Sequence, residues 1–518
     1  MQQIEVLHGT YYDSVTLMRV AQEITKIEGL KEATLNMATE ANIKIMEAAG
    51  FNFSGYKLSA SDLIIAVEGE KAVLGEAIAK AKEYLVSPPW KKNQVSDSQE
   101  YNPKSLDGAL SILPDANLSL ISVAGRYAGA EAKKSLEKGL HVMLYSDNVP
   151  LETEIEIKKI AKDKNLLVMG PDCGTAVIRG KGLGFANACP TGPVGIVAAA
   201  GTGLQEVHVQ LARRGVGVLH AIGTGGRDVK EDVGGITTLS GIDALIEDDE
   251  IKVIVVIGKP PAPSVEKKVL EKLQHGNKPS VIGFIGSKLA EDRPPIYVCR
   301  ELEETAAVAA ALVLGQEVEA VREKLTKRYE SLKRKALKSR HKGFLRGLYS
   351  GGTLCYEAQL IAADLIGPVY SNVPLKSEMR LPDSLKSIGH SMVDYGEDEF
   401  TQGRLHPMMD SSFRAKRLIM EAEDPEVKAV LFDCVIGYGC HPEPAKQMAE
   451  AVKRARTKTG DRVTFISYVC GVDSDPQNAA RQREILERAG VIVLDSNAEA
   501  ARFACYSVMG DDKYGING

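Results

Sequence analysis

The chain has 518 residues and a net charge of -5, with its lysines and arginines dispersed rather than clustered, which argues against nucleic acid as the main partner. No apolar run reaches the roughly 20 residues that cross a bilayer, and the opening residues 1–6 lack the basic and apolar regions of a signal peptide. We therefore expect a cytoplasmic protein with no membrane partner. At about 150 residues per domain, this length predicts three or four domains.

The cysteine pattern indicates reduced thiols. Eight cysteines are scattered along the chain, with no Cys-x-x-Cys pair and no Cys/His cluster at zinc-finger spacing. Isolated thiols of this kind fit buried positions in or beside strands. We predict no metal site.

Residues 1–86 are predicted to form a small α/β module. The alternation of apolar residues and their helical spacing indicate strands at 4–7, 31–37 and 61–67 and helices at 13–27 and 71–85. This order suggests a ferredoxin-like, two-layer fold. Residues 87–100 are polar, contain two prolines and show no period, which is typical of a linker.

Residues 101–189 are predicted to form a parallel sheet. The pattern indicates apolar strands at 117–123, 141–145 and 166–170, separated by helices at 130–138 and 152–163. Uniformly apolar strands imply helices on both faces of the sheet. Loops after such strands lie along the edge where open α/β sheets bind ligands.

Two glycine-threonine loops are the main candidates for a binding site. Gly201-Thr202-Gly203 and Gly351-Gly352-Thr353 each stand between an apolar strand pattern and an amphipathic helix pattern. Glycine lets the main chain approach a ligand, and the first N–H groups of a helix favour negative charge. Each loop therefore predicts an anion site, with a plain strand-to-helix turn as the alternative.

The segments around both loops repeat the same order of elements. Residues 247–258 align with residues 423–433, and each copy continues with a proline-containing loop, a helix and another buried strand. This repeat predicts a duplicated α/β domain, with copies at 190–316 and 344–518. The charged segment 317–343 between them mixes basic residues with glutamates and is interpreted as a solvated linker helix.

These patterns resemble the CoA-ligase fold shared by succinyl-CoA synthetase and ATP-citrate lyase. Gly170-Pro-Asp-Cys-Gly-Thr175 is similar to the close of that family's CoA-binding domain, which implies a CoA-binding-like Rossmann domain at 101–189. Residues 192–226 resemble the phosphate-handling domain of the α subunit, and residues 345–503 resemble the matching domain of the β subunit. The resemblance implies an α/β fold of several parallel-sheet domains, Rossmann-like or flavodoxin-like, behind the N-terminal module.

Three segments resemble the FdrA family more specifically. They begin at Gly9-Thr-Tyr-Tyr-Asp-Ser-Val15, at Leu345-Arg-Gly-Leu-Tyr-Ser-Gly351 and at Gly403-Arg-Leu-His-Pro-Met-Met-Asp410. This resemblance implies a subunit of oxamate carbamoyltransferase, which exchanges a carbamoyl group between carbamoyl phosphate, oxamate, oxalurate and phosphate during ureide (allantoin) breakdown. It implies a small anionic substrate and other subunits in a hetero-oligomer, with self-association as a further expectation.

Three departures from the synthetases argue against CoA and ATP as cofactors. A synthetase carries its phosphoryl group on a histidine in a Gly-His-Ala-Gly loop, but residues 287–303 contain no histidine. The segment 317–343 stands where an ATP-grasp region would be needed, and no P-loop occurs elsewhere. The sheet that would bind CoA begins near Asn117, behind an unrelated module. We expect no certain cofactor, and carbamoyl phosphate or phosphate as substrate.

Carbamoyl transfer needs donors for the phosphate, a group that polarises the carbonyl and a cation for the carboxylate of oxamate. The predicted phosphate donors are the main-chain N–H groups of Gly201, Thr202, Gly203, Gly351, Gly352 and Thr353. Arg227 or Arg404 is the predicted bidentate clamp.

The loop at 403–410 brings Arg404, His406 and Asp410 together before a helix expected to start at 411 or 412. A cation beside a titratable group suits oxyanion stabilisation or proton transfer. The alternative is that Asp410 caps the helix and His406 is a turn residue. The remaining candidates, in order, are His441, Asn372 and His390.

Two other functions stay open. One is an acyl-CoA synthetase, similar to succinate–CoA ligase, whose nucleotide-binding module is on another chain. The other is a non-catalytic regulatory subunit whose glycine turns bind effectors. CoA-dependent consumption of ATP would favour the first, and partner activity that survives substitution of Gly352, Arg404 and His406 would favour the second.

Overall fold

The computed structural model describes residues 1–509 apart from 11, 13, 49, 90–102, 104, 289–290, 339–340 and 402–403. The chain divides into two compact units. Unit 1 comprises Met1–Asn102 and Tyr395–Lys416, and unit 2 comprises Pro103–Asp394 and Arg417–Gly518. Residues 395–416 therefore group with the N-terminal residues, although the repeat pattern includes them in the copy at 344–518. The predicted linker at 87–100 lies largely outside the described residues.

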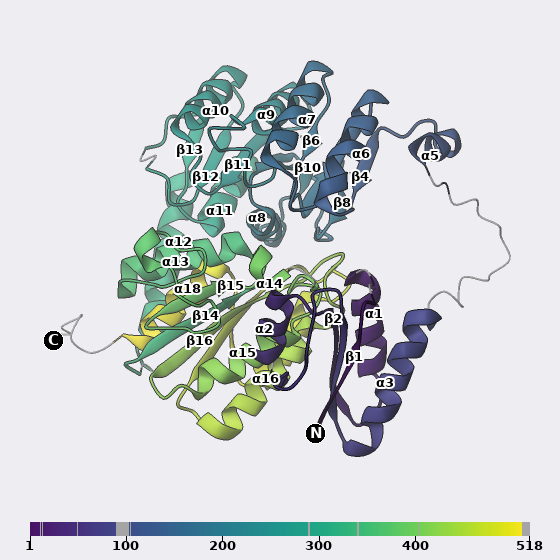
Figure 1. Ribbon diagram of the computed structural model, residues 1–518. Coiled ribbons are helices and arrows are strands. Elements are labelled where there is room, and N and C mark those ends of the chain that lie inside the picture. The colour runs from purple at the N-terminus through teal and green to yellow at the C-terminus, as the bar shows by residue number, and fades with distance from the viewer. Residues whose placement is uncertain are drawn as a thin grey trace. The chain divides into compact units, whose positions relative to one another are not determined.

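Unit 1 is built on a three-stranded antiparallel sheet in the order β1-β3-β2. Its elements are β1 (Gln2–Leu7), α1 (Ser14–Thr25), β2 (Leu30–Met37), α2 (Glu40–Ala48), β3 (Leu63–Gly69), α3 (Lys71–Val86) and α14 (Asp398–Thr401) (Figure 1). Side chains alternate along β3, so that Leu63, Ile65 and Val67 pack against α1 and α3, whereas Ile64 and Ala66 pack on the opposite face. That face is covered by Met46 of α2 and by two phenylalanines, a layer that the sequence pattern does not predict.

Unit 2 begins with a small parallel sheet in the order β4-β5-β6. Its elements are α5 (Leu106–Ile112), β4 (Leu118–Ile121), α6 (Gly125–Glu137), β5 (His141–Leu144), α7 (Leu151–Asp163) and β6 (Val168–Met169). Leu136 of α6 and Ile157 of α7 pack with Val142 and Leu144 of the central strand. The parallel sheet predicted from the apolar strands is confirmed.

The next sheet of unit 2 has seven strands, in the order β13-β12-β11-β9-β10-β7-β8. The strands are β7 (Thr175–Ile178), β8 (Lys181–Gly184), β9 (Val194–Ala198), β10 (Val218–Gly223), β11 (Val253–Gly258), β12 (Ser280–Phe284) and β13 (Ile296–Val298). Strands β9 to β13 are parallel, and the hairpin β7–β8 is joined to β10 antiparallel.

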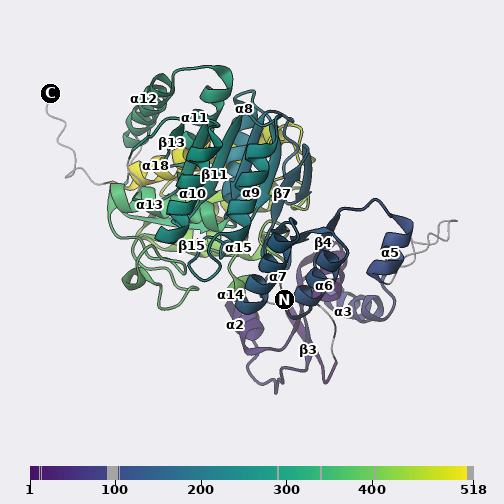
Figure 2. The same cartoon turned by 90° about the horizontal axis from the view of Figure 1, so that it is seen from above.

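Four helices cover this sheet. They are α8 (Gly201–Arg213), α9 (Ile236–Glu247), α10 (Pro263–Gly276) and α11 (Leu302–Leu314). Leu245 of α9 and Val265 and Val269 of α10 join the core formed by the central strands, and these two helices lie side by side over one face in Figure 2. Helices α8 and α11 pack against each other on the other face.

The last sheet has five parallel strands, in the order β15-β14-β16-β17-β18. Its strands are β14 (Phe344–Tyr349), β15 (Ser391–Asp394), β16 (Val427–Val435), β17 (Thr464–Cys470) and β18 (Ile492–Leu494). Its helices are α13 (Gly352–Ile366), the 3-10 turn η1 (Ser377–Met379), α15 (Ser412–Glu423), α16 (Pro444–Thr459), α17 (Ala479–Arg488) and α18 (Asn497–Val508).

Both large sheets share one topology. Numbering the five parallel strands of each by their order in the chain gives 2-1-3-4-5 in both, which is the flavodoxin-like order. The predicted duplication of an α/β domain is therefore confirmed. Below, the sheet of β9–β13 is called the first copy and the sheet of β14–β18 the second copy.

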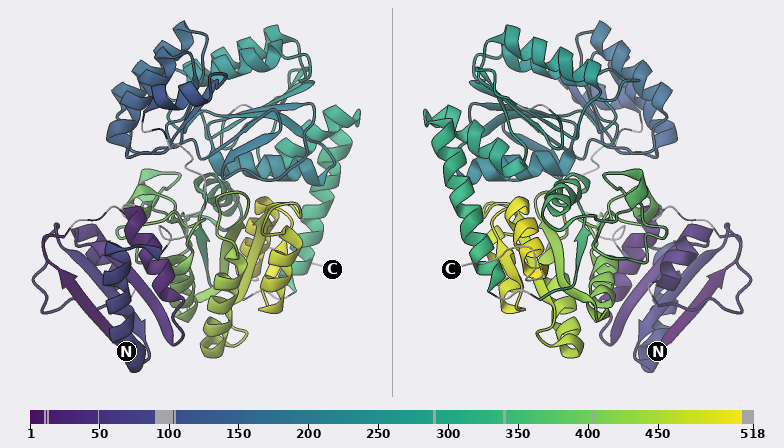
Figure 3. Two further views of the ribbon diagram at one scale, coloured as in Figure 1. Left: turned by 90° about the vertical axis from the view of Figure 1, so that its right-hand side faces the viewer. Right: turned by 90° about the vertical axis from the view of Figure 1, so that its left-hand side faces the viewer.

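Helix α12 (Val318–Leu337) connects the two copies (Figure 3). Its buried residues Val318, Leu325 and Leu332 recur every seven positions and form one stripe, and the helix packs against α11 and α18. The linker helix predicted as solvated is thus buried along one face. Among the described residues, no helix has the length and apolar character needed to span a membrane.

Candidate functional site

The two glycine loops lie in direct contact. A Cβ atom placed on Gly351 would come within 2.8 Å of the Thr202 side chain, and one placed on Gly203 would come within 2.9 Å of Thr353 Cγ2. Each threonine therefore fills the space left by the glycine of the other copy, as residues do at a two-fold interface. The starts of α8 and α13, which we predicted would face one ligand, meet at one place.

The start of α13 is already paired with a carboxylate of its own sheet. Asp433, in β16, accepts hydrogen bonds from the N–H groups of Ser350 (2.9 Å) and Gly351 (3.0 Å) and from Ser350 Oγ (2.9 Å). The Gly351 N–H is therefore not available to phosphate, contrary to the prediction. Asp394, at the end of β15, lies so close that a Cβ on Gly352 would be 2.6 Å from its Oδ2 atom.

The start of α8 differs from that of α13. Ile257 of β11 aligns with Asp433. Ile257 pairs with Ala198, three residues before the start of α8, and Asp433 follows the pair of Phe432 with Leu348, so it stands opposite Tyr349, three residues before the start of α13. The first copy thus has isoleucine where the second has the capping aspartate. Gly201 is exposed, and a Cβ there would meet no atom within 4 Å. The first N–H groups of α8 also lack partners within the helix.

Two residues that the sequence analysis did not single out lie beside these helix starts. Lys259 follows β11, and its Nζ atom lies 5.2 Å from the ring centroid of Tyr356, on α13. The Tyr356 hydroxyl would lie 3.0 Å from a Cβ on Gly286, after β12, so this ring covers the ends of two strands of the first copy. A lysine directly after a fully apolar strand was the available signal for this position.

Arg227, predicted as a phosphate clamp, belongs to a different cluster. Its Nε atom lies 2.8 Å from Glu154 Oε2 and its Nη2 donates to the Val149 carbonyl (2.8 Å), both in or beside α7. The neighbouring Lys158 is fully buried between Glu154 and Asp228. The arginine is thus held by α7 because a buried carboxylate needs cations around it.

Arg404 lies in unit 1, whereas the glycine loops lie in unit 2. Its guanidinium stacks on the Phe413 ring, 5.1 Å from the centroid, and its buried Nε atom has no hydrogen-bond partner among the described residues. Burial lowers its pKa to about 10, against the opposing effect of Asp410 and Glu32. Gly403, which begins this motif, lies outside the described residues.

His406 and Asp410 take the roles named as their alternatives. His406 Nδ1 accepts the Met408 N–H (3.3 Å), and burial lowers the pKa of His406 to about 4, with Arg414 adding to the effect. The imidazole is therefore neutral at pH 7, which does not suit proton transfer near neutrality. Asp410 accepts the Ser412 N–H (2.9 Å) and thereby caps α15, which begins at Ser412 as expected.

The remaining candidates have structural partners. His441 Nδ1 accepts the Glu443 N–H (3.0 Å) in the loop after β16. Asn372 bridges the main chain of Asp394 through both atoms of its amide. His390 Nδ1 accepts the Leu345 N–H (3.1 Å), and burial lowers its pKa to about 4.

Each copy also places a carboxylate at a helix start of the other copy. Glu357 of α13 accepts the Leu302 N–H at the start of α11 (2.7 Å), and Glu206 of α8 accepts the Asn497 N–H at the start of α18 (3.4 Å). Burial, reinforced by the nearby Glu301, raises the pKa of Glu357 to about 8. Each copy thus caps a helix of the other, which keeps the glycine loops together.

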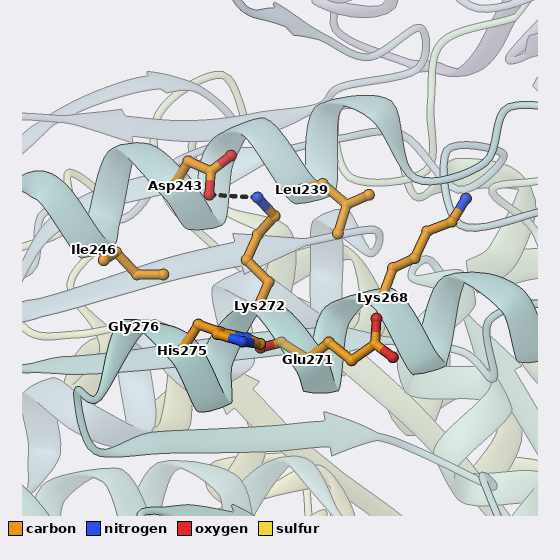
Figure 4. Close-up of a pocket in the computed structure, with 8 residues that line it drawn as sticks. All are labelled: Leu239, Asp243, Ile246, Lys268, Glu271, Lys272, His275 and Gly276. Carbon is orange, nitrogen blue, oxygen red and sulfur yellow. Dashed lines mark hydrogen bonds and ion pairs between the residues drawn. The ribbon is translucent and has the colours of Figure 1, made fainter.

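A surface groove lies elsewhere, between α9 and α10 (Figure 4). It runs from Leu239 to Gly276, and the ion pair of Lys272 with Asp243 crosses it. Helices in such sheets run antiparallel to the strands, so the end of the groove at Gly276 lies toward the amino ends of the strands. This is the edge away from the glycine loops, and the groove is not part of the candidate site.

Three family models match parts of the chain. The model described as "CoA-ligase" matches residues 348–506, "CoA binding domain" matches 191–286, and "AllF, heavy metal-associated domain" matches 1–103. The first two assign the duplicated sheets to the CoA-ligase fold. The CoA-binding match falls on the first copy, whereas the resemblance placed a CoA-binding-like domain at 101–189.

Two relatives and one solved structure are similar to all or part of this chain. The Escherichia coli (strain K12) "Uncharacterized protein YahF" is 38% identical over 507 residues, which cover 97% of each chain. The α subunit of Staphylococcus epidermidis succinate–CoA ligase (ADP-forming) is 27% identical over 179 residues, 34% of this chain and 58% of that subunit. The structure of PH0766 from Pyrococcus horikoshii OT3 covers 76% of this chain and 84% of its own, with 16% identity and a TM-score of 0.33.

The residues of unit 1 do not fit the metal that the third family description suggests. Heavy metals prefer thiolate ligands, and none of the eight cysteines lies in residues 1–103. Across the described parts of the chain, no three His, Cys, Asp or Glu side chains are grouped to hold a metal ion. Asp62 accepts the N–H groups of Gly9 and Ser59 and contacts His8, so it closes a loop.

Proposed function

The chain belongs to the family of the Escherichia coli protein YahF, and we propose that it is an FdrA-like subunit of an ATP-independent carbamoyltransferase. Its fold is of the succinyl-CoA synthetase-like CoA-ligase type. In the proposed reaction the amide nitrogen of oxamate attacks the carbonyl carbon of carbamoyl phosphate. A C–N bond forms, the C–O bond to phosphate breaks, and the nitrogen loses a proton. Oxalurate and phosphate are the products, and the reverse reaction breaks down oxalurate.

The observation that carries this proposal is the reciprocal contact of Thr202 with Gly351 and of Thr353 with Gly203. It brings the start of α8, whose first main-chain N–H groups have no partner within the helix, to the interface of the two copies, so that these N–H groups act on an anion there. Such donors stabilise negative charge as it develops on a leaving phosphate, and they need no reorganisation during the reaction.

The chain lacks the residues that would energise a substrate. Residues 287–303 contain no histidine to carry a phosphoryl group, and α12 stands where an ATP-grasp region would be required. A donor already activated as a mixed anhydride, such as carbamoyl phosphate, fits a site that only binds and positions.

The test is phosphorolysis of oxalurate by the chain together with its partner subunits. We expect carbamoyl phosphate to form when oxalurate and phosphate are supplied without ATP or CoA. A complex purified from cells that forms neither carbamoyl phosphate from oxalurate and phosphate nor oxalurate from carbamoyl phosphate and oxamate would refute the proposal. Gly351→Ala, which crowds the contact between the loops, should lower the rate, whereas Gly75→Ala, in α3, has no neighbour to disturb and lies outside both loops.

The second candidate is an acid–CoA ligase that obtains its nucleotide-binding module from another chain. The CoA-ligase and CoA-binding family matches favour it. It predicts that ATP is consumed only when CoA and a carboxylic acid are both present with partner subunits. The two candidates are distinguished by omitting CoA, because only the carbamoyltransferase would then stay active.

A further inference from the structure

Lys259 lies at the position where a sheet of this topology binds its ligand. In the order β10-β9-β11-β12-β13, the connection after β9 leads to one side of the sheet and the connection after β11 to the other. The crevice at such a switch point is bounded by the loops after these two strands. One of these loops contains Gly201 and the other begins with Lys259.

The ammonium group of Lys259 has no carboxylate partner in the part of the chain that the structure describes. Its contact is with the ring of Tyr356, 5.2 Å from Nζ to the centroid. An aromatic face attracts a cation through its quadrupole and occupies no hydrogen-bond acceptor. The N–H donors of Lys259 therefore remain free to bind an acceptor from outside the protein.

The second copy has an internal carboxylate where the first copy has none. Ile257 of β11 aligns with Asp433, and Lys259 aligns with Val435. Asp433 accepts hydrogen bonds from three donors at the start of α13. The first copy lacks that carboxylate and has a lysine two positions later, so the two glycine loops are not equivalent.

We propose that Lys259 pairs with the phosphate of the substrate at the start of α8, and that only this helix start, not that of α13, receives the external anion. This inference rests on the proposed function and deepens it, because it assigns the cation of the site. A small phosphate dianion would then be held by a positive side chain from one loop and by main-chain N–H groups from the other. The carboxylates Asp433 and Asp394 would exclude a second anion from α13.

The experiment measures binding of inorganic phosphate to the full chain by calorimetry. Lys259→Gln should weaken binding by about 10- to 100-fold, as expected for loss of a charged hydrogen-bond donor, and Lys259→Arg should retain most of it. Lys252→Gln is the matched control, because Lys252 is an exposed lysine at the other end of β11. Equal affinity for the wild type and Lys259→Gln would overturn the inference while leaving the proposed function intact.

A second measurement uses the wild type alone. Phosphate should protect Lys259, but not Lys252, from acylation by acetic anhydride, as read by mass spectrometry of the peptides. Equal labelling of Lys259 with and without phosphate, in a protein that binds phosphate, would also refute the role of Lys259. If the wild type binds no phosphate and its complex forms no carbamoyl phosphate, the proposed function itself fails.

Discussion

The contact between the two glycine loops can be tested by a double-mutant cycle of Gly203→Ala and Thr353→Ser. The new Cβ of Gly203→Ala would lie 2.9 Å from Thr353 Cγ2 and 3.2 Å from Ala200 Cβ, well inside the roughly 3.5–4.0 Å of an ordinary carbon contact. Thr353→Ser removes the nearer of these atoms and keeps the hydroxyl. The two changes should therefore compensate each other.

The magnitude follows from the packing. Overfilling a packed site costs about 1–3 kcal/mol, against a gain of up to ~1 kcal/mol from replacing glycine by alanine in a helix. Removing the Thr353 methyl group should cost about 0.5–1.5 kcal/mol, as in other single-methyl deletions. In the double variant the vacated space accepts the new Cβ, so we expect a favourable coupling free energy of about 1–2 kcal/mol.

The assay is differential scanning calorimetry of the full chain, following the transition that contains both copies. For a domain of about 150–250 residues, 1 kcal/mol shifts the midpoint by roughly 2–4 °C. Gly201→Ala is the control, because no atom lies within 4 Å of its Cβ, and it should change stability by no more than ~0.5 kcal/mol. Additive effects of the two single variants, within about 0.5 kcal/mol, would show that the loops do not touch.

Two further predictions concern buried charges. The folded pKa of Glu357 is about 8 rather than 4.5. The proton on Glu357 therefore contributes fully to the free energy of unfolding below pH 4.5. This contribution is lost as the pH rises to 8, by roughly 5 kcal/mol in total. The unfolding free energy of Glu357→Gln should therefore fall less over this range than that of the wild type, and parallel pH profiles would contradict this. Lys158→Met should cost about 3–5 kcal/mol in chemical unfolding, because it leaves Glu154 and Asp228 buried without the ammonium group. Lys159→Met, at the exposed neighbouring position, is the control, and an equally small effect of both changes would contradict the ion-pair account.

Local patterns were sufficient to predict most elements of the fold. The apolar runs at 194–198 and 344–349 become the first strands of the two copies, and the glycine loops that follow them begin α8 and α13. The repeat predicted a duplication that the shared strand order confirms. Helix α2 was missed because its apolar pattern is short, and the small hairpin β7–β8 because it contributes only an edge to the sheet.

The candidate site depended on contacts that no local pattern contains. Asp433 is distant in sequence from the loop that it caps, and it lies near the end of a mostly apolar strand. The sequence shows no partner for Arg227, whereas in the structure Arg227 pairs with Glu154 of α7, which is distant in sequence. Lys259 could not be predicted as a site residue, because its role depends on the contact with Tyr356 and on its position at the switch point of the sheet.

By itself, the sequence determined which segments become buried strands, where helices begin and that one domain occurs twice, because hydrophobic period and glycine placement act over a few residues. Only the tertiary structure decided which N–H groups remain free to bind an anion. Whether these N–H groups are free depends on the side chains that neighbouring strands place beside them. The Asp433 carboxylate lies at the start of α13, and no carboxylate from the matching position lies at the start of α8.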